Sequence, residues 1–443
     1  MRIGLVSLGR GVPIGLVYLG TYLKKHKVDV RIIDSNFQDV YAEVMCGDFD
    51  LIGISAMTVY YGDAIRLARH LKQLGVPVII GGVHISTLPS SFEDCFDGAV
   101  LGEGEEVLLQ IAEGGNYKGL LQGKPIENLD DLPLPDWSLV DKRYFAHTPS
   151  TTFGEFGVGG NILTSRGCPY KCLFCSTTQF WGKLRFHSAE YVVDMLEDLI
   201  THYHANLIQI WDDLFTINLP RIEKIRELLV RRGLASKRIK YNCQPRANLV
   251  NDELCRLLKE VGVTMGIFGF ESGSDKVLGY LKNDTVTVYE NMKAIDCFHR
   301  NGLKVQGSVV LGSPTETIGD MYCTLQFVDF CIRMGVERLW VFVLTPFPGT
   351  VMWSIAKQRG RVRDANFDWD SLTCHNVDKP LLLDDYEFFW AFQRVYELIQ
   401  RKVRGQRWNK VRSFLLHNPI QSIMYFIRHS HRVIDLLMRK EDV

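Results

Sequence analysis

Three cysteines lie close together in the segment SRGCPYKCLFCS, which runs from Ser165 to Ser176. They are Cys168, Cys172 and Cys175, in the pattern CxxxCxxC. A structural zinc site takes four ligands, typically as two pairs, and no second pair of matching spacing follows in the chain. A four-iron cluster also takes four thiolates, so three from one loop leave one iron without a protein ligand. We therefore expect an iron–sulfur cluster with one open iron, at which a small molecule can bind and be reduced.

The overall composition is that of a folded protein without a strong net charge. The chain has 443 residues, of which 46% are hydrophobic and 23% charged, enough for two or three globular domains. Lysine plus arginine balance aspartate plus glutamate at 51 each, so the charge does not indicate a nucleic-acid partner. The start of the chain has no signal-peptide pattern, and no apolar stretch is long enough to span a bilayer. Eleven cysteines in such a chain indicate reduced thiols, so we expect a cytoplasmic protein.

The first 115 residues alternate short apolar runs with helix-length segments. The runs are RIGLVS, VDVRIID, DLIGISA, VPVIIGG and GAVLGEG. Such runs are typical of a parallel sheet covered on both faces, so we expect an α/β fold that starts with a doubly wound, Rossmann-like domain. Ligands bind these sheets at the carboxyl ends of the strands. The candidate binding residues in the turns there, which are rich in glycine, are Gly9, Gly11, Ser55, Gly81, Gly82, His84, Gly102, Glu103 and Gly104.

A second alternating unit spans residues 161–350 and follows an irregular segment, 116–160, that we interpret as a linker. Five helical segments separate its strands. Six strand-then-helix units predict a partial parallel (β/α)6 barrel, whose active site lies at the carboxyl ends of the strands. The cysteine loop follows the first strand and therefore lies at that mouth. The expected strands are Asn161–Thr164, Leu207–Trp211, Ile239–Gln244, Thr264–Phe270, Lys304–Leu311 and Arg338–Leu344.

Residues 351–443 form a C-terminal extension that we expect to be mostly helical. A helix is predicted from Asp384 to Val403, and a basic tail rich in aromatic residues follows from Arg404. Two interpretations of this tail stay open: a packed C-terminal helix, or a peripheral contact with a membrane surface or a large amphipathic substrate.

The cysteine motif and the glycine-rich segments together resemble a known family. The segments PIGLVYLGTYL, LIGISAMT, GGVHISTLP and VLGEGEE are similar to those of a radical S-adenosylmethionine (SAM) enzyme with an N-terminal cobalamin-binding domain, as in class B radical SAM methyltransferases and anaerobic tetrapyrrole cyclases. The resemblance covers the chain from Met1 to about Leu372. It implies that the three cysteines hold a 4Fe-4S cluster, whose open iron binds the amino and carboxylate groups of SAM. It further implies that the cluster splits SAM to a 5′-deoxyadenosyl radical, and that Phe174 lies against the adenine.

The resemblance also implies SAM-binding groups at the ends of later barrel strands. Asp212 and Asp213 follow the second strand, where the family holds the SAM ammonium; a cap of the next helix is the alternative interpretation. Arg246 follows the third strand and could pair with the SAM carboxylate, or could be a surface arginine. Glu271 and Ser272 end the fourth strand and are expected at the ribose hydroxyls or the methionine part of SAM.

Cobalamin is the second cofactor that the resemblance implies, bound against the strand ends of the first domain. The better-known cobalamin fold carries a D-x-H-x-x-G motif whose histidine ligates cobalt, whereas the first loop here reads SLGRGVPIG. His84 is the nearby candidate for a lower ligand, with a polar role in the pocket as its alternative. We expect cobalamin to be held without a protein axial ligand; a domain that has lost cobalamin and only supports the barrel is the remaining alternative.

With both cofactors, the reaction that we expect is methylation of an unactivated carbon of a small or hydrophobic substrate. One SAM would methylate cobalamin, and a second would yield the radical that removes hydrogen from the substrate. The alternatives are a cyclase or rearrangement enzyme without net methyl transfer, and an iron–sulfur protein for electron transfer or sensing. The substrate could be a lipid or a tetrapyrrole, and the resemblance implies a flavodoxin or ferredoxin as electron donor. No catalytic side chain and no nucleic-acid partner are predicted.

Overall fold

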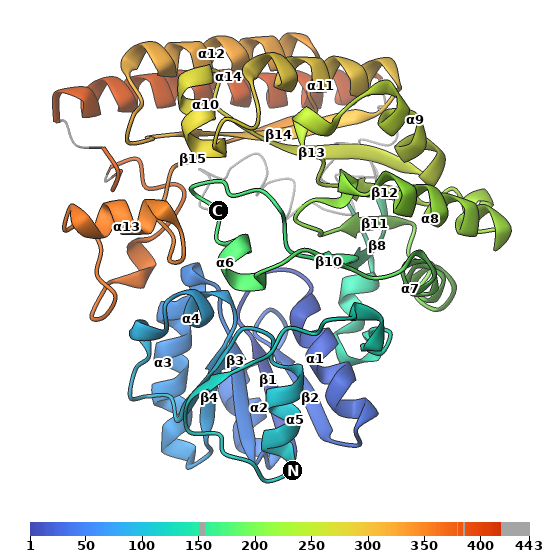
Figure 1. Ribbon diagram of the computed structural model, residues 1–443, viewed down its shortest axis with the longest axis vertical. Coiled ribbons are helices and arrows are strands. Elements are labelled where there is room, and N and C mark those ends of the chain that lie inside the picture. The colour runs from blue at the N-terminus through green and yellow to red at the C-terminus, as the bar shows by residue number, and fades with distance from the viewer. Residues whose placement is uncertain (150–155, 379, 384–385, 418–443) are drawn as a thin grey trace.

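Two sheets, one above the other in the view of Figure 1, organise the molecule. The computed structural model describes residues 1–149, 156–378, 380–383 and 386–417. The first sheet belongs to the N-terminal part of the chain and the second to the remainder. Both are mainly parallel, with helices packed on them, so the α/β class expected from the alternating pattern is confirmed.

The N-terminal sheet is parallel throughout and has the strand order β2-β1-β3-β4-β5-β6. The central strands are buried almost end to end, which explains their continuous apolar runs. The last strand, β6, lies in the segment that the sequence predicts as linker, because its residues are exposed and carry no buried apolar run. The strands are β1 (Arg2–Ser7), β2 (Asp29–Asp34), β3 (Leu51–Ser55), β4 (Val78–Gly81), β5 (Gly98–Leu101) and β6 (Gly119–Gln122).

The helices of this domain cover both faces of the sheet, as a doubly wound fold requires. The chain passes from β1 to β2 on one side and to β3 on the other, so the strand order reverses between β1 and β3. Ligands bind such sheets at the crevice beyond this reversal. The helices are α1 (Ile14–Lys25), α2 (Val40–Gly47), α3 (Tyr61–Leu71), α4 (Val83–Thr87) and α5 (Glu105–Ala112).

The second sheet is the open, parallel half-barrel that the sequence predicts. Its order is β15-β14-β13-β12-β11-β8-β7, and only β7 is antiparallel to its neighbour. The six parallel strands begin within a few residues of the predicted ones, except that β8 starts and ends earlier. The strands are β7 (His147–Pro149), β8 (Phe156–Ile162), β11 (Leu207–Ile210), β12 (Lys240–Cys243), β13 (Val263–Glu271), β14 (Lys304–Leu311) and β15 (Arg338–Val343).

Helices on the outer side of this sheet alternate with its strands. Five of the six begin with a side-chain cap, for example Ser188, which accepts a hydrogen bond from the backbone of Tyr191, and the capping box of Thr287 and Glu290. The helices are α7 (Ala189–His202), α8 (Leu219–Arg231), α9 (Asp252–Val261), α10 (Asp275–Lys282), α11 (Val288–Arg300) and α12 (Ile318–Arg333).

The carboxyl ends of the two sheets approach each other, and the segment with the cysteines lies between them (Figure 1). This segment is a short hairpin of β9 (Ser165–Arg166) and β10 (Arg185–Phe186) that encloses the cysteine loop and helix α6 (Thr177–Trp181). At Gly349, which follows β15, an added Cβ would lie 2.7 Å from Thr87 of α4 and 3.0 Å from Gln179 of α6. Elements of both domains and the cysteine segment therefore meet at one place.

The C-terminal part contributes helix α13 (Val351–Gln358) and helix α14 (Tyr386–His417), which packs on α12. Within the described part of the chain, no helix has both the length and the apolar character needed to cross a membrane. Most of the basic tail, residues 418–443, lies outside the described residues.

Candidate active site

The cysteine loop is held in place by backbone hydrogen bonds to two neighbouring segments. Leu173 donates to the carbonyl of Leu281 at the end of α10 (2.9 Å), and its own carbonyl accepts from Val351 at the start of α13 (3.0 Å). Gly167, just before the first cysteine, has φ +97°, and a Cβ there would lie 2.8 Å from the carbonyl oxygen of Lys183. The loop therefore has a fixed path that requires glycine at its entrance.

The three thiols of the loop lie close enough together to influence one another electrostatically. Burial raises the pKa of the Cys168 thiol, and the nearby Asp213, Cys175 and Cys172 raise it further. Among the described residues, no three Cys, His, Asp or Glu side chains converge closely enough to hold a single metal ion. Three thiolates are the number that a four-iron cluster with one open iron takes from the protein.

The two aspartates after β11 have different environments. Asp212 is fully buried. Its Oδ1 accepts from the Thr164 backbone (2.5 Å), and its Oδ2 accepts from the hydroxyls of Thr164 (2.5 Å) and Ser165 (2.6 Å). Asp212 therefore ties β11 to the segment after β8 and offers no free oxygen, which corrects its expected role at the SAM ammonium. Asp213 is exposed beside the cysteine loop, where it accepts from the Thr177 hydroxyl at 3.1 Å.

Glu271 and Ser272 also make contacts within the protein. Glu271 is buried with φ +63°, a conformation that is uncommon outside glycine, and its Oε1 lies 3.5 Å from Lys282 Nζ. The Ser272 hydroxyl is fully buried, 3.1 Å from the Thr324 hydroxyl of α12, and it accepts from the backbone of Ser274. Ser272 therefore fixes the turn onto α12. The positive φ of Glu271 at the mouth of the barrel is a strained backbone conformation of the kind that clusters at functional sites. Phe174 is half-buried against the apolar core on the side of the N-terminal domain.

A pocket opens at the carboxyl ends of the N-terminal strands, where a ligand of a doubly wound sheet is expected. It contains Ser55 and five of the predicted turn residues, and its empty volume is about 750 Å³. At Gly82, with φ +99°, a Cβ would come within 2.7 Å of the carbonyl oxygen of Ala56, so only glycine fits. Phe180 and Trp181 of α6 cover the pocket from the side of the cysteine loop. The predicted residues in the lining are Ser55, Gly81, Gly82, Gly102, Glu103 and Gly104.

His84 does not line this pocket. Its ring is fully buried, with Nδ1 3.1 Å from the Thr58 hydroxyl and Nε2 3.1 Å from the Ser91 hydroxyl. It stacks on Tyr61 at 3.7 Å between centroids and meets the edge of Trp369 at 4.5 Å. Both ring nitrogens therefore have protein partners, and His84 has a packing role in this structure.

Gly9 and Gly11 also lie outside the pocket lining. Their carbonyl oxygens instead accept hydrogen bonds from the Asn36 amide (2.8 Å) and the Tyr144 hydroxyl (2.7 Å). This first loop is therefore tied to β2 and to the segment after β6, and the structure gives neither glycine a place in the pocket.

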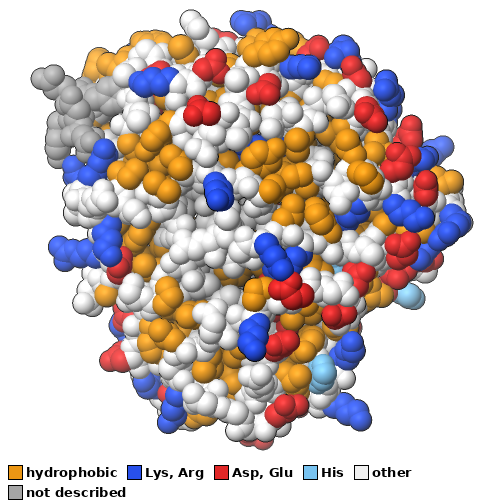
Figure 2. Space-filling view, viewed as in Figure 1, with side chains coloured by type: hydrophobic (Ala, Val, Ile, Leu, Met, Phe, Trp, Pro, Cys, Tyr) orange, Lys and Arg blue, Asp and Glu red, His pale blue; other side chains and the backbone are white. Residues whose placement is uncertain are grey.

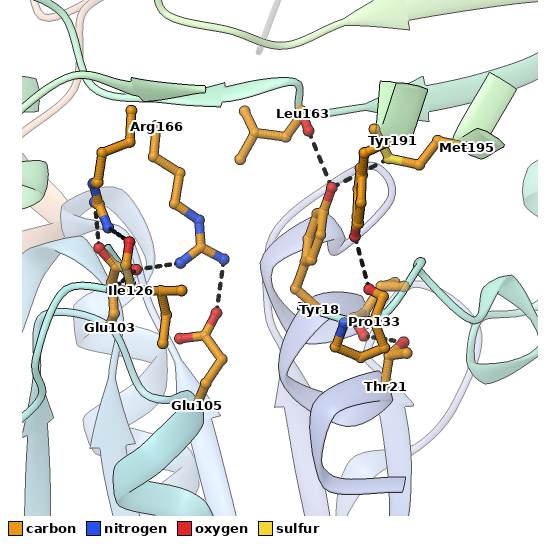
Figure 3. A network of polar contacts seen from close by, with 12 residues as sticks. Tyr18, Thr21, Glu103, Glu105, Ile126, Pro133, Leu163, Arg166, Tyr191 and Met195 are labelled. Atoms are coloured by element: carbon orange, nitrogen blue, oxygen red, sulfur yellow. Dashed lines mark hydrogen bonds and ion pairs between the residues drawn. The ribbon is translucent and has the colours of Figure 1, made fainter. Parts of the chain in front are cut away.

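A buried network of four charged residues, which the sequence does not predict, joins the pocket to the cysteine segment (Figure 3). Arg166 of β9 donates to Glu103, and it donates to Glu105 Oε1 at 2.7 Å. Arg185 of β10 donates to the other oxygen of Glu103. Each of these side chains is about 95% buried, so every charge requires its partners. The signal in the sequence was Arg166 itself, a charged residue next to a strand end and two residues before the first cysteine.

Glu103 is consequently a structural residue rather than a cofactor ligand. Its two oxygens bind Arg166, Arg185 and the backbone of Ile126 (3.2 Å). A second contact between the domains lies beside the network, where Tyr18 of α1 donates from its hydroxyl to the carbonyl of Leu163 at 3.0 Å (Figure 3). The position of the pocket relative to the cysteine loop is therefore set by buried polar contacts.

Comparison with known proteins agrees with this arrangement. A profile of the Radical SAM superfamily matches residues 162–328, and one of the B12 binding domain matches residues 3–112. An uncharacterized methyltransferase of Pyrococcus horikoshii is 30% identical over 376 residues, covering 78% of this chain and 78% of that protein. The bacteriochlorophyllide d C-12(1)-methyltransferase of Chlorobaculum tepidum is 25% identical over 419 residues, which cover 90% of this chain and 86% of that protein.

A solved structure shares the fold across both domains. The radical SAM methyltransferase TsrM from Kitasatospora setae, with cobalamin and a [4Fe-4S] cluster bound, superposes with a TM-score of 0.65 at 18% identity, covering 82% of this chain and 76% of its own. The chain therefore belongs to the radical SAM superfamily, as an enzyme with a B12-binding domain whose cofactors are a [4Fe-4S] cluster, SAM and cobalamin.

Proposed function

We propose that this enzyme methylates an unactivated carbon of a small or hydrophobic substrate. The observation that carries the proposal is the opposition of the two sheets, with the cysteine loop at one mouth, the glycine-lined pocket at the other, and the Arg166 network between them. When bound, SAM at the cluster supplies a radical that removes hydrogen, and cobalamin supplies the methyl group. Both must reach the same substrate carbon, which opposed strand ends allow.

The side chains of this chain act by binding and orienting rather than by acid–base chemistry. Cys168, Cys172 and Cys175 would hold the cluster, and the glycines of the pocket would let cobalamin approach the backbone. Phe180 and Trp181 lie between the pocket and the cysteine loop and would keep water from the reacting carbon. Since His84 is engaged elsewhere, cobalamin is proposed to bind without this histidine as a ligand.

Exposed apolar side chains at both mouths support a hydrophobic substrate. Met57, after β3, is 52% exposed, and Trp211, after β11, is 49% exposed. The indole of Trp211 is held by a 2.6 Å hydrogen bond from Nε1 to Asn161 Oδ1. In the space-filling view, hydrophobic side chains border the middle region where the domains meet (Figure 2). Flat or lipid-like substrates, such as the bacteriochlorophyllide d for which the Chlorobaculum tepidum relative is named, suit such a surface.

The remaining parts of the proposal concern the setting of the enzyme. Cluster reduction requires an external electron donor, for which we propose a flavodoxin or ferredoxin. A cytoplasmic location suits the reduced cysteines. A peripheral membrane contact through the C-terminal tail stays a prediction, because most of that tail lies outside the described residues.

Anaerobic reconstitution tests the proposal. The protein is loaded with iron, sulfide and hydroxocobalamin, desalted and analysed for metals, and then incubated with SAM, dithionite and candidate hydrophobic substrates. About one cobalt per chain, with both 5′-deoxyadenosine and S-adenosylhomocysteine as products, supports methyl transfer. 5′-Deoxyadenosine without S-adenosylhomocysteine supports the cyclase or rearrangement alternative, and iron without cobalt contradicts the role of the N-terminal pocket.

A further inference from the structure

Arg246 is fixed against the cysteine loop on two sides. Its guanidinium lies over the ring of Tyr170, 3.8 Å from the centroid, and Nη1 donates to Sγ of Cys172 at 3.5 Å. Nη2 donates to the Thr285 hydroxyl at 2.5 Å, and that hydroxyl donates to the carbonyl of Lys282. Only 9% of the residue is exposed. The charged group is therefore held in one orientation, with one N–H group directed at a cysteine sulfur.

No carboxylate balances this charge among the residues that the structure describes. The ion pairs found there do not include Arg246, and its Nε is buried without a hydrogen-bond partner. The buried Arg166 and Arg185 have glutamate partners. The buried Arg221 donates instead to the backbone carbonyls of His187 and Thr164. Arg246 donates to neither an acid nor a backbone carbonyl among the described residues, so a negative group beside its guanidinium would stabilise the buried charge. Three thiolates with the iron–sulfur core carry net negative charge, which grows by one on reduction.

We propose that Arg246 raises the reduction potential of the cluster by donating a charge-assisted hydrogen bond to the Cys172 thiolate. The proposal rests on the proposed function, since it requires the three cysteines to hold the cluster. A positive charge and a hydrogen bond at a ligand sulfur stabilise the reduced, more negative cluster more than the oxidised one. Arg246 would thereby ease the electron transfer that precedes SAM cleavage.

This role differs from the one expected from the sequence, in which Arg246 pairs with the SAM carboxylate. A bidentate pair requires two parallel N–H groups of the guanidinium. Nη1 and Nη2 already have protein partners, and Tyr170 covers one face of the group. The two roles predict different measurements: one changes SAM affinity, and the other changes the cluster before any SAM is present.

The experiment is a redox titration of the reconstituted full-length protein without SAM, followed by the EPR signal of the reduced cluster. We compare wild type with Arg246→Lys, Arg246→Gln and Thr285→Val. Loss of the charge in Arg246→Gln is expected to shift the midpoint potential to more negative values. Arg246→Lys keeps the charge without the fixed geometry, so its midpoint potential is expected between those of wild type and Arg246→Gln. Thr285→Val is expected to shift the midpoint potential less than Arg246→Gln does. The control is Arg143→Gln, which removes an arginine paired with Asp141 at the surface of the segment between the two domains.

SAM binding to each variant is measured in parallel by equilibrium dialysis. An unchanged midpoint potential in Arg246→Gln, with weakened SAM binding, would overturn the proposal and favour the carboxylate role. If Arg246→Gln does not assemble a cluster, the midpoint potentials of Arg246→Lys and Thr285→Val provide the test. Potentials more negative than wild type support the proposal, and potentials equal to wild type overturn it. A wild-type protein that assembles no cluster contradicts the proposed function instead, so the two failures are distinguishable.

Discussion

Arg166 Nη2 donates to Glu105 Oε1 at 2.7 Å, and this buried pair connects β9, next to the cysteine loop, to the first turn of α5 in the B12-binding domain. The two residues lie 61 positions apart in the sequence. Because Arg166 also binds Glu103 at the rim of the pocket, one guanidinium from the cysteine segment holds two glutamates of the B12-binding domain. The geometry between the two cofactor sites thus depends on a small number of buried charges.

Breaking this pair is expected to lower the stability of the whole molecule. Glu105→Gln leaves Arg166 with a surplus positive charge in the interface, and the loss of one partner of a buried pair costs about 3 kcal/mol. Denaturant unfolding, followed by circular dichroism under anaerobic conditions, measures the effect. The double variant Glu105→Gln/Arg166→Met is expected to lose less than the sum of the single variants, because it leaves fewer unpaired charges.

The matched control is Arg232→Met. Arg232 also contacts two acids, Asp194 and Glu197, but these side chains are 27–46% exposed. Surface pairs of this kind contribute less than about 1 kcal/mol. Equal losses in the buried and the surface variants would show that the network has no special role in joining the domains.

The sequence was sufficient for the central strands of both sheets and most of their helices, because parallel strands carry apolar runs and most of the helices have polar residues at their starts. Helix α10 was not among the five helices predicted for the second unit. The sequence was also sufficient for the cysteine loop, whose spacing is local. It could not show which polar side chains at the strand ends face inward. Asp212 and Asp213 are neighbours, yet one is fully buried among hydroxyls and the other is exposed, because the chain leaves the strand at Ile210 and turns at Asp213.

Long-range pairing was the second limit. Glu103 looked like a pocket ligand because it stands between two glycines, but its partners Arg166 and Arg185 follow 63 and 82 residues later. His84 likewise appeared next to a glycine pair, and its contact with Trp369 comes from the C-terminal part of the chain. Strand β6 was not predicted, because an exposed edge strand has no buried apolar run in its sequence.

The cysteine assignment predicts that Cys168→Ala loses the cluster. Iron and acid-labile sulfide in the reconstituted variant should fall to a small fraction of the wild-type content, and 5′-deoxyadenosine formation should disappear with them, because two thiolates from this loop are insufficient. Cys46→Ala, at an exposed cysteine of α2, is the control and should retain both. A Cys168→Ala protein that still cleaves SAM would contradict the role given to that thiol.

The pocket assignment predicts that Gly81→Leu prevents cobalamin binding without unfolding the protein. Gly81 ends β4 and lines the pocket, and a Cβ at this position would have no neighbour closer than the carbonyl oxygen of Val100 at 3.8 Å. The larger side chain therefore fits by occupying the pocket. Cobalt content after desalting should fall to background while iron content stays at the wild-type level. The pocket would be the wrong site if cobalt were retained.

His84→Phe is expected to leave the cobalamin spectrum unchanged. If the imidazole were a cobalt ligand, EPR of the cob(II)alamin form would show nitrogen coupling that the variant loses; we expect identical signals.

Burial lowers the pKa of His84 to about 3, from an ordinary value of 6.5. The unfolded chain therefore binds a proton between pH 6.5 and 3 that the folded protein does not, so wild type loses stability as the pH falls through this range. His84→Phe should lose less over the same range, as measured by thermal unfolding.

Glu316 gives the opposite pH dependence. Burial raises the pKa of this carboxyl from 4.5 to about 7, although its Oε2 accepts from the backbone of Gly312 (2.6 Å) and Ser313 (3.2 Å). The folded protein therefore holds a proton between pH 4.5 and 7 that the unfolded chain releases, and wild type loses stability as the pH rises through this range. Glu316→Gln keeps an oxygen for both backbone donors and removes the charge. The free energy of unfolding of the variant minus that of wild type should be up to about 3 kcal/mol larger at pH 8 than at pH 5. Thermal unfolding of both proteins at the two pH values measures the difference, and parallel curves would show that Glu316 is already ionised in the folded protein at pH 5.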